Sequence, residues 1–258
     1  MVGELLSGGR YLLNGFSLIG EAKLRRYVAI PLLINVLVFA GLFWLATGWF
    51  ADWMASFSWL NPDPESWLAT IVGPLLFLLK LLFGAAMLII FAFTFSLVAN
   101  LLAAPFNSLL AERVEAHLRG RPLSASSDSL RHVLASIPKV LGSEFAKLLY
   151  MLVRLLPILL LYLIPGVNII APFVSFVFGA WMLSLEYLDY PMGNHGFLFR
   201  EIRSTVKRRR PIALGFGSAV TVMTAIPVLN LIAMPVAVAG ATKLWVDRLA
   251  ASEKPARQ

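Results

Sequence analysis

The densest group of side chains that could bind a ligand lies at the start of the first long apolar segment. Residues 20–31 read GEAKLRRYVAIP and place Lys23, Arg25 and Arg26 directly before that segment. The first amides of a helix have no partner within it, and the positive end of the helix dipole favours an anion there. Two guanidinium groups would add charge-assisted hydrogen bonds to a tetrahedral oxyanion. Basic residues also occur at the cytoplasmic helix ends of any membrane protein, so the spacing leaves both interpretations open.

Two more cations, Lys80 and Arg154, lie inside apolar segments. Charged side chains within a bilayer are costly and indicate function by default, and their shared sign favours an anionic cargo. The alternative is that each extends its charge to the interface or pairs with an acid from a loop. Polar residues beside the apolar segments could line a pathway, cap helices or form a solvated face. The full set of candidate pathway residues is Asn35, Lys80, Asn100, Glu112, Arg113 and Arg154.

Enzyme chemistry has little support in this sequence. There is no Cys, and the three His residues show no metal-ligand spacing. No HExxH, Walker A or GxSxG motif occurs, and no nucleophile has an evident base. The sequence therefore predicts no enzyme, no cofactor and no metal. The net charge of +8 would suggest nucleic acid in a soluble domain, but here it is attributed to cytoplasmic loops, so no nucleic-acid partner is expected.

The elements that must position these residues are membrane helices. Of 258 residues, 59% are hydrophobic and 14% are charged, whereas soluble domains have about 25% charged residues. Residues 27–50 carry no charge and residues 67–106 carry one, so each predicts a long transmembrane helix. Residues 52–66 between them are acidic and are expected outside. Residues 107–147 predict a cytoplasmic helical region, with Leu109, Leu110, Val114 and Leu118 on one face and Glu112, Arg113 and Glu115 elsewhere.

The last two apolar blocks form an internal repeat of helical hairpins. Residues 148–185 are interrupted by IPGVNIIAP and residues 212–242 by IPVLNLIAMP, and both interruptions contain a helix-breaking Pro. Arms 212–226 and 228–242 of the second hairpin would each be about 22 Å long, too short to span a bilayer. The arms of the first hairpin are borderline in length, but neither tip carries a charge. Both hairpins are predicted to be re-entrant, with a cytoplasmic basic loop over 186–211. All blocks of Lys and Arg fall on one side, which predicts cytoplasmic termini and a single membrane domain over 1–258.

Several motifs resemble the CysZ-type sulfate permeases of bacterial inner membranes. They are GxxYLLNGFSLI at 8–19, LRRYVAIPLLIN at 24–35, ANLLAAPFNSLLAERVE at 99–115 and EYLDYPMGNHG with FLF at 186–199. The resemblance implies a multi-pass inner-membrane homo-oligomer that takes up sulfate for cysteine synthesis without an ATP-binding subunit. It also implies two transmembrane helices and two hemi-penetrating hairpins per chain. Matched to the family's Gly-Leu-Arg-Arg turn, the sulfate-binding residues are Leu24, Arg25 and Arg26, with Ala22-Lys23 replacing the usual Pro-Gly.

Other functions remain open at this point. Hairpins that enter lipid from one side could belong to a non-transporting scaffold, and a channel for another oxyanion would show the same charges. Sulfite and thiosulfate are the expected competitors of sulfate. Flux could be passive or proton-coupled, and Glu112 is the carboxylic acid to test first for coupling.

Overall fold

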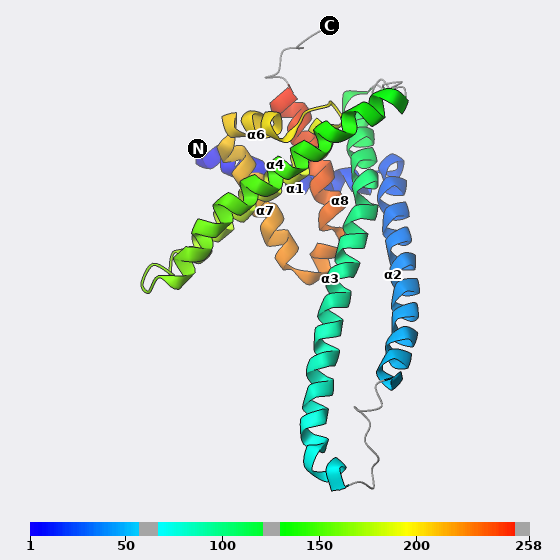
Figure 1. Ribbon diagram of the computed structural model, residues 1–258. Helices are drawn as coiled ribbons and strands as arrows, with labels where there is room; N and C mark the ends of the chain where they lie inside the picture. Colours follow the sequence, from blue (N-terminus) through cyan, green and yellow to red (C-terminus); the bar gives the residue numbers. More distant parts are fainter. Residues whose placement is uncertain (57–66, 121–129, 251–258) are drawn as a thin grey trace. The chain divides into compact units, whose positions relative to one another are not determined.

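The computed structural model describes residues 1–56, 67–120 and 130–250, and the regular elements within these ranges are all helices (Figure 1). They are α1 (Val2–Gly20), α2 (Ala22–Ser56), α3 (Trp67–Arg119), α4 (Leu130–Leu163), α5 (Ala171–Gly193), α6 (Phe199–Arg208), α7 (Arg210–Ala225), α8 (Pro227–Leu244) and the π-helical turn η2 (Trp245–Leu249). The predicted all-helical class is confirmed. The predicted long helices over 27–50 and 67–106 fall within α2 and α3.

The chain, predicted as a single membrane domain, divides into two compact units. One unit is Ala29–Pro105, which contains most of α2 and α3. The other combines Met1–Val28 with Phe106–Gln258. The boundary at Pro105 coincides with the predicted end of the apolar span, although α3 itself continues as a helix to Arg119.

Three helical stretches among the described residues are long and apolar enough to cross a membrane, namely Lys139–Leu163, Ala171–Gly193 and Pro227–Leu249. This corrects the predicted length of the arm over 228–242. α8 runs to Leu244 and continues into η2, and Nζ of Lys243 lies 3.1 Å from Oδ2 of Asp247, one helical turn later. Only α7, with 16 residues and about 24 Å, remains as short as predicted.

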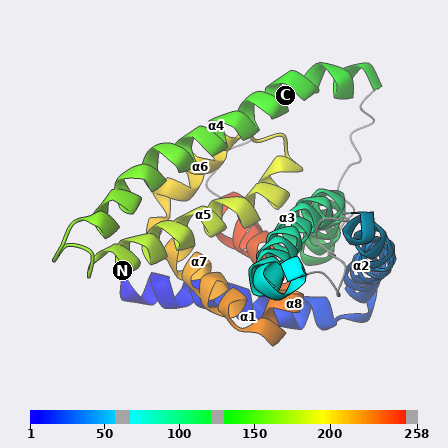
Figure 2. The same ribbon diagram turned by 60° about the horizontal axis from the view of Figure 1, so that its bottom comes forward.

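The two hairpins break where the repeat predicts. A turn over 164–170 separates α4 from α5, and the second break falls at Ile226, directly before Pro227 begins α8. Figure 2 shows that α4 and α5 meet at their turn and diverge away from it. The structure confirms the breaks; the depth to which the hairpins enter a membrane remains a prediction.

Most residues of the predicted cytoplasmic basic loop over 186–211 are helical, and the side of the membrane that they face remains a prediction. α5 continues to Gly193 and α6 occupies Phe199–Arg208. The amide of Leu198 donates to Oε2 of Glu201 at 2.8 Å and starts α6, which buries Phe199 and Ile202. The many charges of this stretch concealed its amphipathic pattern.

The helix α1 packs against both arms of the second hairpin through glycines (Figures 1 and 2). A Cβ atom at Gly8 would lie 2.1 Å from the carbonyl oxygen of Ile212, and one at Gly15 would lie 2.1 Å from that of Val236. No other residue permits this approach of backbone to backbone. α1 therefore fixes the chain just before α2 against the core formed by α7 and α8.

Candidate functional site

The turn between α1 and α2 carries the predicted anion-binding residues. Glu21 adopts an extended conformation with φ −69° and ψ 136°, and α2 begins at Ala22. The carbonyl oxygen of Glu21 accepts hydrogen bonds from the amides of Leu24, at 2.9 Å, and Arg25, at 3.0 Å. The Leu24 side chain is 2% exposed and packs in the core. Leu24 therefore anchors the turn, while the first amides of α2, at Ala22 and Lys23, have no hydrogen-bond partner among the described residues.

The two arginines of the turn point in different directions. Nε of Arg25 donates to the carbonyl oxygen of Gly20 at 3.1 Å, which satisfies a carbonyl at the end of α1. The guanidinium of Arg26 lies over the ring of Tyr27, with Cζ 5.0 Å from the ring centroid. Successive helical residues are about 100° apart around the axis, so neighbouring side chains leave on different faces.

Arg113 of α3 lies over the same Tyr27 ring, with Cζ 5.5 Å from its centroid. Arg26 and Arg113 thereby line one pocket of about 760 Å³, which we call the basic pocket. Its described lining residues are Ala22, Lys23, Leu24, Arg26, Tyr27, Arg113, Ala116, His117 and Gly120. None of them is acidic, and Lys23, Arg26 and Arg113 are basic. At the pocket, Nε2 of His117 lies 2.6 Å from Oε2 of Glu21.

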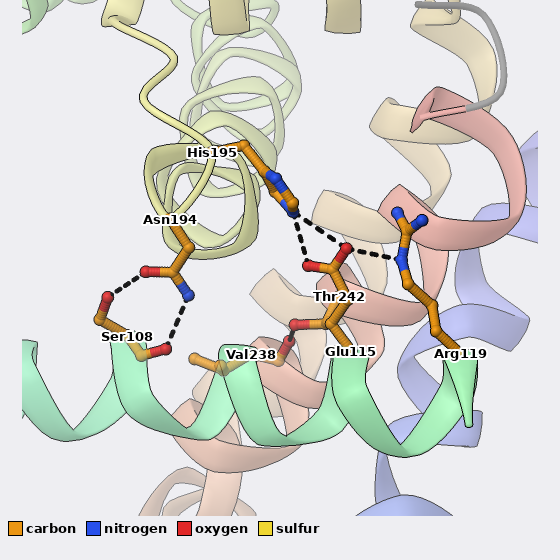
Figure 3. Close-up of polar contacts among 7 residues, drawn as sticks. All are labelled: Ser108, Glu115, Arg119, Asn194, His195, Val238 and Thr242. Carbon is orange, nitrogen blue, oxygen red and sulfur yellow. Dashed lines mark hydrogen bonds and ion pairs between the residues drawn. The ribbon is translucent and has the colours of Figure 1, made fainter. Parts of the chain in front are cut away.

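The part of α3 that carries Arg113 is held by a buried carboxylate. Leu110 and Val114 pack in the core as predicted, but Glu115, predicted off the apolar face, is fully buried. Nε2 of His195 lies 2.9 Å from both of its carboxylate oxygens, and Nε of Arg119 lies 2.7 Å from Oε1 (Figure 3). A buried carboxylate requires such partners, so this group fixes how α3 is rotated.

A second polar contact joins the same two segments. The amide nitrogen of Asn194 donates to the carbonyl oxygen of Ser108 at 2.8 Å, and the Ser108 hydroxyl donates to Oδ1 of Asn194 (Figure 3). Asn107, 7% exposed, places its amide 3.4 Å from the Tyr190 hydroxyl. The motif over 186–199 therefore positions the α3 segment that supplies Arg113 and His117. The sequence analysis identified the motif but not this role, because the spacing of residues within the motif does not indicate which residues of α3 it contacts.

Of the remaining predicted residues whose side chains the structure describes, Glu112 and Arg154 do not line the basic pocket. The side chains of Asn35, Lys80 and Asn100 lie outside the part of the chain that the structure describes. Glu112 is partly buried and is not a lining residue of the pocket. Arg154 lies over Tyr150, Cζ 3.8 Å from the ring centroid, in a separate groove. Within the described residues, no three potential metal-ligand side chains come together.

Helices of this length and apolarity define an integral membrane protein of the α-helical class. Residues 11–235 match the family described as Sulfate transporter CysZ/Etoposide-induced protein 2.4. A relative from Pectobacterium atrosepticum, named Sulfate transporter CysZ, is 40% identical over 243 residues, which cover 94% of this chain and 85% of the relative. The chain belongs to this family, which confirms the resemblance found in its motifs and the prediction of a transporter rather than an enzyme.

Proposed function

We propose that this protein transports sulfate across the bacterial inner membrane and that the basic pocket is where sulfate binds. The observation that carries the proposal is that Arg26 and Arg113, from separate helices, flank one aromatic ring in a pocket whose described lining residues include no acid. Membership of the sulfate transporter family and the name of the Pectobacterium relative support the choice of anion.

Each lining residue has a chemical role in this proposal. The guanidinium groups of Arg26 and Arg113 donate paired hydrogen bonds to the sulfate oxygens, and the ammonium of Lys23 adds charge without fixed geometry. The first amides of α2, at Ala22 and Lys23, are free to donate at the positive end of the helix dipole. The Tyr27 ring holds both guanidinium groups through cation–π contacts and so reduces the ordering required on binding.

Leu24 and Arg25 support the site in a different way. Leu24 holds the turn through its buried side chain, and Arg25 uses Nε to bind the end of α1. The terminal nitrogens of Arg25 remain able to attract an anion approaching the turn. We therefore assign direct binding chiefly to Arg26 and Arg113, with Arg25 secondary. Asn35, Lys80, Asn100 and Glu112 remain proposed pathway residues.

The membrane arrangement is also part of the proposal. Two transmembrane helices over 27–50 and 67–106, together with two re-entrant hairpins, would form a multi-pass homo-oligomer, and the short α7 supports the second hairpin entering from one side only. Moving a dianion into a negative interior costs about 4.6 kcal/mol per 100 mV. Uptake without ATP therefore requires a sulfate gradient, rapid consumption of sulfate inside, or proton coupling.

The binding site is tested by equilibrium dialysis of radiolabelled sulfate against the full chain in detergent. We expect the double variant Arg26→Gln/Arg113→Gln to bind sulfate at least about 30-fold more weakly, because two charge-assisted contacts are lost. The control Arg10→Gln/Arg208→Gln removes the same charge outside the pocket and should stay within about twofold. Equal losses in both variants would reject the site. Competition by sulfite and thiosulfate, but not by molybdate or phosphate, would support sulfate as the cargo over a general oxyanion.

A further inference from the structure

A second group of basic residues surrounds Tyr150. The guanidinium of Arg154 lies over the Tyr150 ring at 3.8 Å, and that of Arg203 lies over it at 4.9 Å. Nε1 of Trp181 donates to the Tyr150 hydroxyl at 3.0 Å and fixes the ring from a third helix. One aromatic ring therefore holds together two cations, from α4 and α6, that would otherwise repel each other.

These residues belong to a groove of about 810 Å³ that shares no lining residue with the basic pocket. Its lining residues are Tyr150, Val153, Arg154, Pro157, Ile158, Phe173, Val174, Val177, Phe178, Trp181, Arg203, Lys207, Arg210 and Leu214. Of these described residues, four are basic and none is acidic. The groove therefore combines a concentrated positive charge with an apolar wall.

The charged and apolar parts occupy different ends of this groove. Trp181 contacts Tyr150 beside the cations, whereas Phe173 lies two helical turns earlier on α5, about 12 Å away along the axis. On α4, Pro157 and Ile158 likewise follow Arg154 toward the turn over 164–170. A ligand that fills the groove must therefore be anionic at one end and apolar along its length.

The side of the groove formed by α4 is apolar and exposed. Its stretch Lys139–Leu163 is long and apolar enough to cross a membrane, and only 6% of its most apolar window is buried. Val153, which lines the groove, is 55% exposed, and Leu156 beside it is 61% exposed. Side chains of this kind are stable when they face lipid chains. A free oxyanion would use only the basic end and leave the apolar wall uncovered.

We propose that this groove binds an anionic glycerophospholipid. Its phosphate is held by Arg154, Arg203, Lys207 and Arg210, and an acyl chain lies along the wall formed by α4 and α5. Arg154, a candidate pathway residue by sequence, is thereby assigned to lipid binding. A bound lipid would join α4 to α6 and α7, which together contribute the four cations.

The run of four basic residues at 207–210 offers a matched test. Lys207 and Arg210 line the groove, and Arg208 and Arg209 are not among its lining residues. Arg208 donates a hydrogen bond to the Thr205 hydroxyl, and Nη1 of Arg209 lies 3.8 Å from Oε1 of Glu4. The full chain in detergent is titrated with palmitoyl-oleoyl phosphatidylglycerol, and lipid adducts are counted by native mass spectrometry. We expect Lys207→Gln/Arg210→Gln to bind roughly 30-fold more weakly and Arg208→Gln/Arg209→Gln to stay within about twofold. If the first pair does not fold, Arg154→Gln replaces it, with about fivefold weaker binding expected.

Two further experiments distinguish binding of a lipid from binding of a free anion. Phe173→Ala, in the groove, should weaken phosphatidylglycerol binding several-fold, and Phe176→Ala, on the same helix outside it, should not. Phosphatidylcholine should bind weakly to every variant, and millimolar sodium sulfate should not displace phosphatidylglycerol. Equal losses in the two charge variants would overturn the proposal, as would equal losses at the two phenylalanines or displacement by sulfate.

Discussion

The imidazole of His195 lies 2.9 Å from both carboxylate oxygens of Glu115, a side chain with no exposed surface. These residues come from the loop after α5 and from α3, and their contact fixes the helix that supplies Arg113 to the basic pocket. In Figure 3 the partners of Glu115 are His195 and Arg119. The hydroxyl of Thr242 lies nearby but donates its hydrogen bond to the carbonyl oxygen of Val238, in the same helix as Thr242.

Removing the buried carboxylate should destabilise the protein. Glu115→Ala leaves His195 and Arg119 without their shared partner, and breaking a buried pair costs about 3 kcal/mol. Glu112→Ala, one turn earlier, is the control, because Glu112 is partly exposed and forms no ion pair within the described residues. Thermal unfolding in detergent should show a midpoint several degrees lower for Glu115→Ala and little change for the control. Similar midpoints would contradict a structural role for the Glu115 contacts.

Adjacent glycines on α1 should respond in opposite ways to Ala. At Gly8 the new Cβ would meet the Ile212 carbonyl at 2.1 Å, so the α1–α7 contact must open, at a cost of about 2 kcal/mol. At Gly9 the nearest atom is 3.8 Å away, and Ala should be neutral or slightly stabilising because it favours helix. Unfolding midpoints of the two variants test this directly, and an equal fall in both would show that the helices do not pack this closely.

Replacing Tyr27 should lower the sulfate affinity of the basic pocket although every charged residue of the pocket is retained. Tyr27→Leu removes the ring that holds Arg26 and Arg113, and two cation–π contacts of about 0.5–1 kcal/mol each correspond to roughly fivefold to 30-fold weaker binding. Tyr27→Phe retains the ring and should bind nearly as well as the native chain. Isothermal titration with sodium sulfate measures both. Affinity unchanged in Tyr27→Leu would show that the ring does not organise the site.

The chain has no Cys, so single thiols can test the re-entrant hairpin. Val228, 75% exposed beside the α7–α8 break, should remain unlabelled by an impermeant maleimide added outside when changed to Cys. Asp52→Cys, at the start of the predicted outer loop, should be labelled under the same conditions. Labelling of Val228→Cys from outside would show that α7 and α8 cross the membrane fully.

The sequence predicted the positions of helices and helix breaks better than the contacts between distant segments. The hairpin breaks before Pro227 and over 164–170 follow from local rules, and so does the buried face of Leu110 and Val114. The burial of Glu115 could not be predicted, because its stabilising partner His195 is distant in the chain and periodicity carries no information about distant contacts. The charge at Lys243 predicts the end of the last arm at Thr242, whereas α8 continues to Leu244 and η2 to Leu249, with Lys243 paired to Asp247.

In the candidate site, too, local features could be predicted from the sequence, whereas contacts between distant segments could not. The basic turn identified Arg25 and Arg26 as one unit, but only the folded chain separates them, with Arg25 on Gly20 and Arg26 on Tyr27. Arg113 was one of several pathway candidates, and its position over the same ring depends on the contacts of Asn194 and His195 with α3. Helix-face arguments within a single segment cannot provide that information.

Sulfate flux into proteoliposomes tests the central claim most directly. The full chain, Arg26→Gln/Arg113→Gln and Arg10→Gln/Arg208→Gln are reconstituted at equal protein content, and uptake of radiolabelled sulfate is followed after an inward gradient is imposed. Native protein and the control pair should admit sulfate at similar rates, while the pocket pair should lose at least about nine-tenths of the initial rate. Vesicles that stay impermeable with correctly folded native protein, or a pocket pair that transports as fast as the control, would contradict the account.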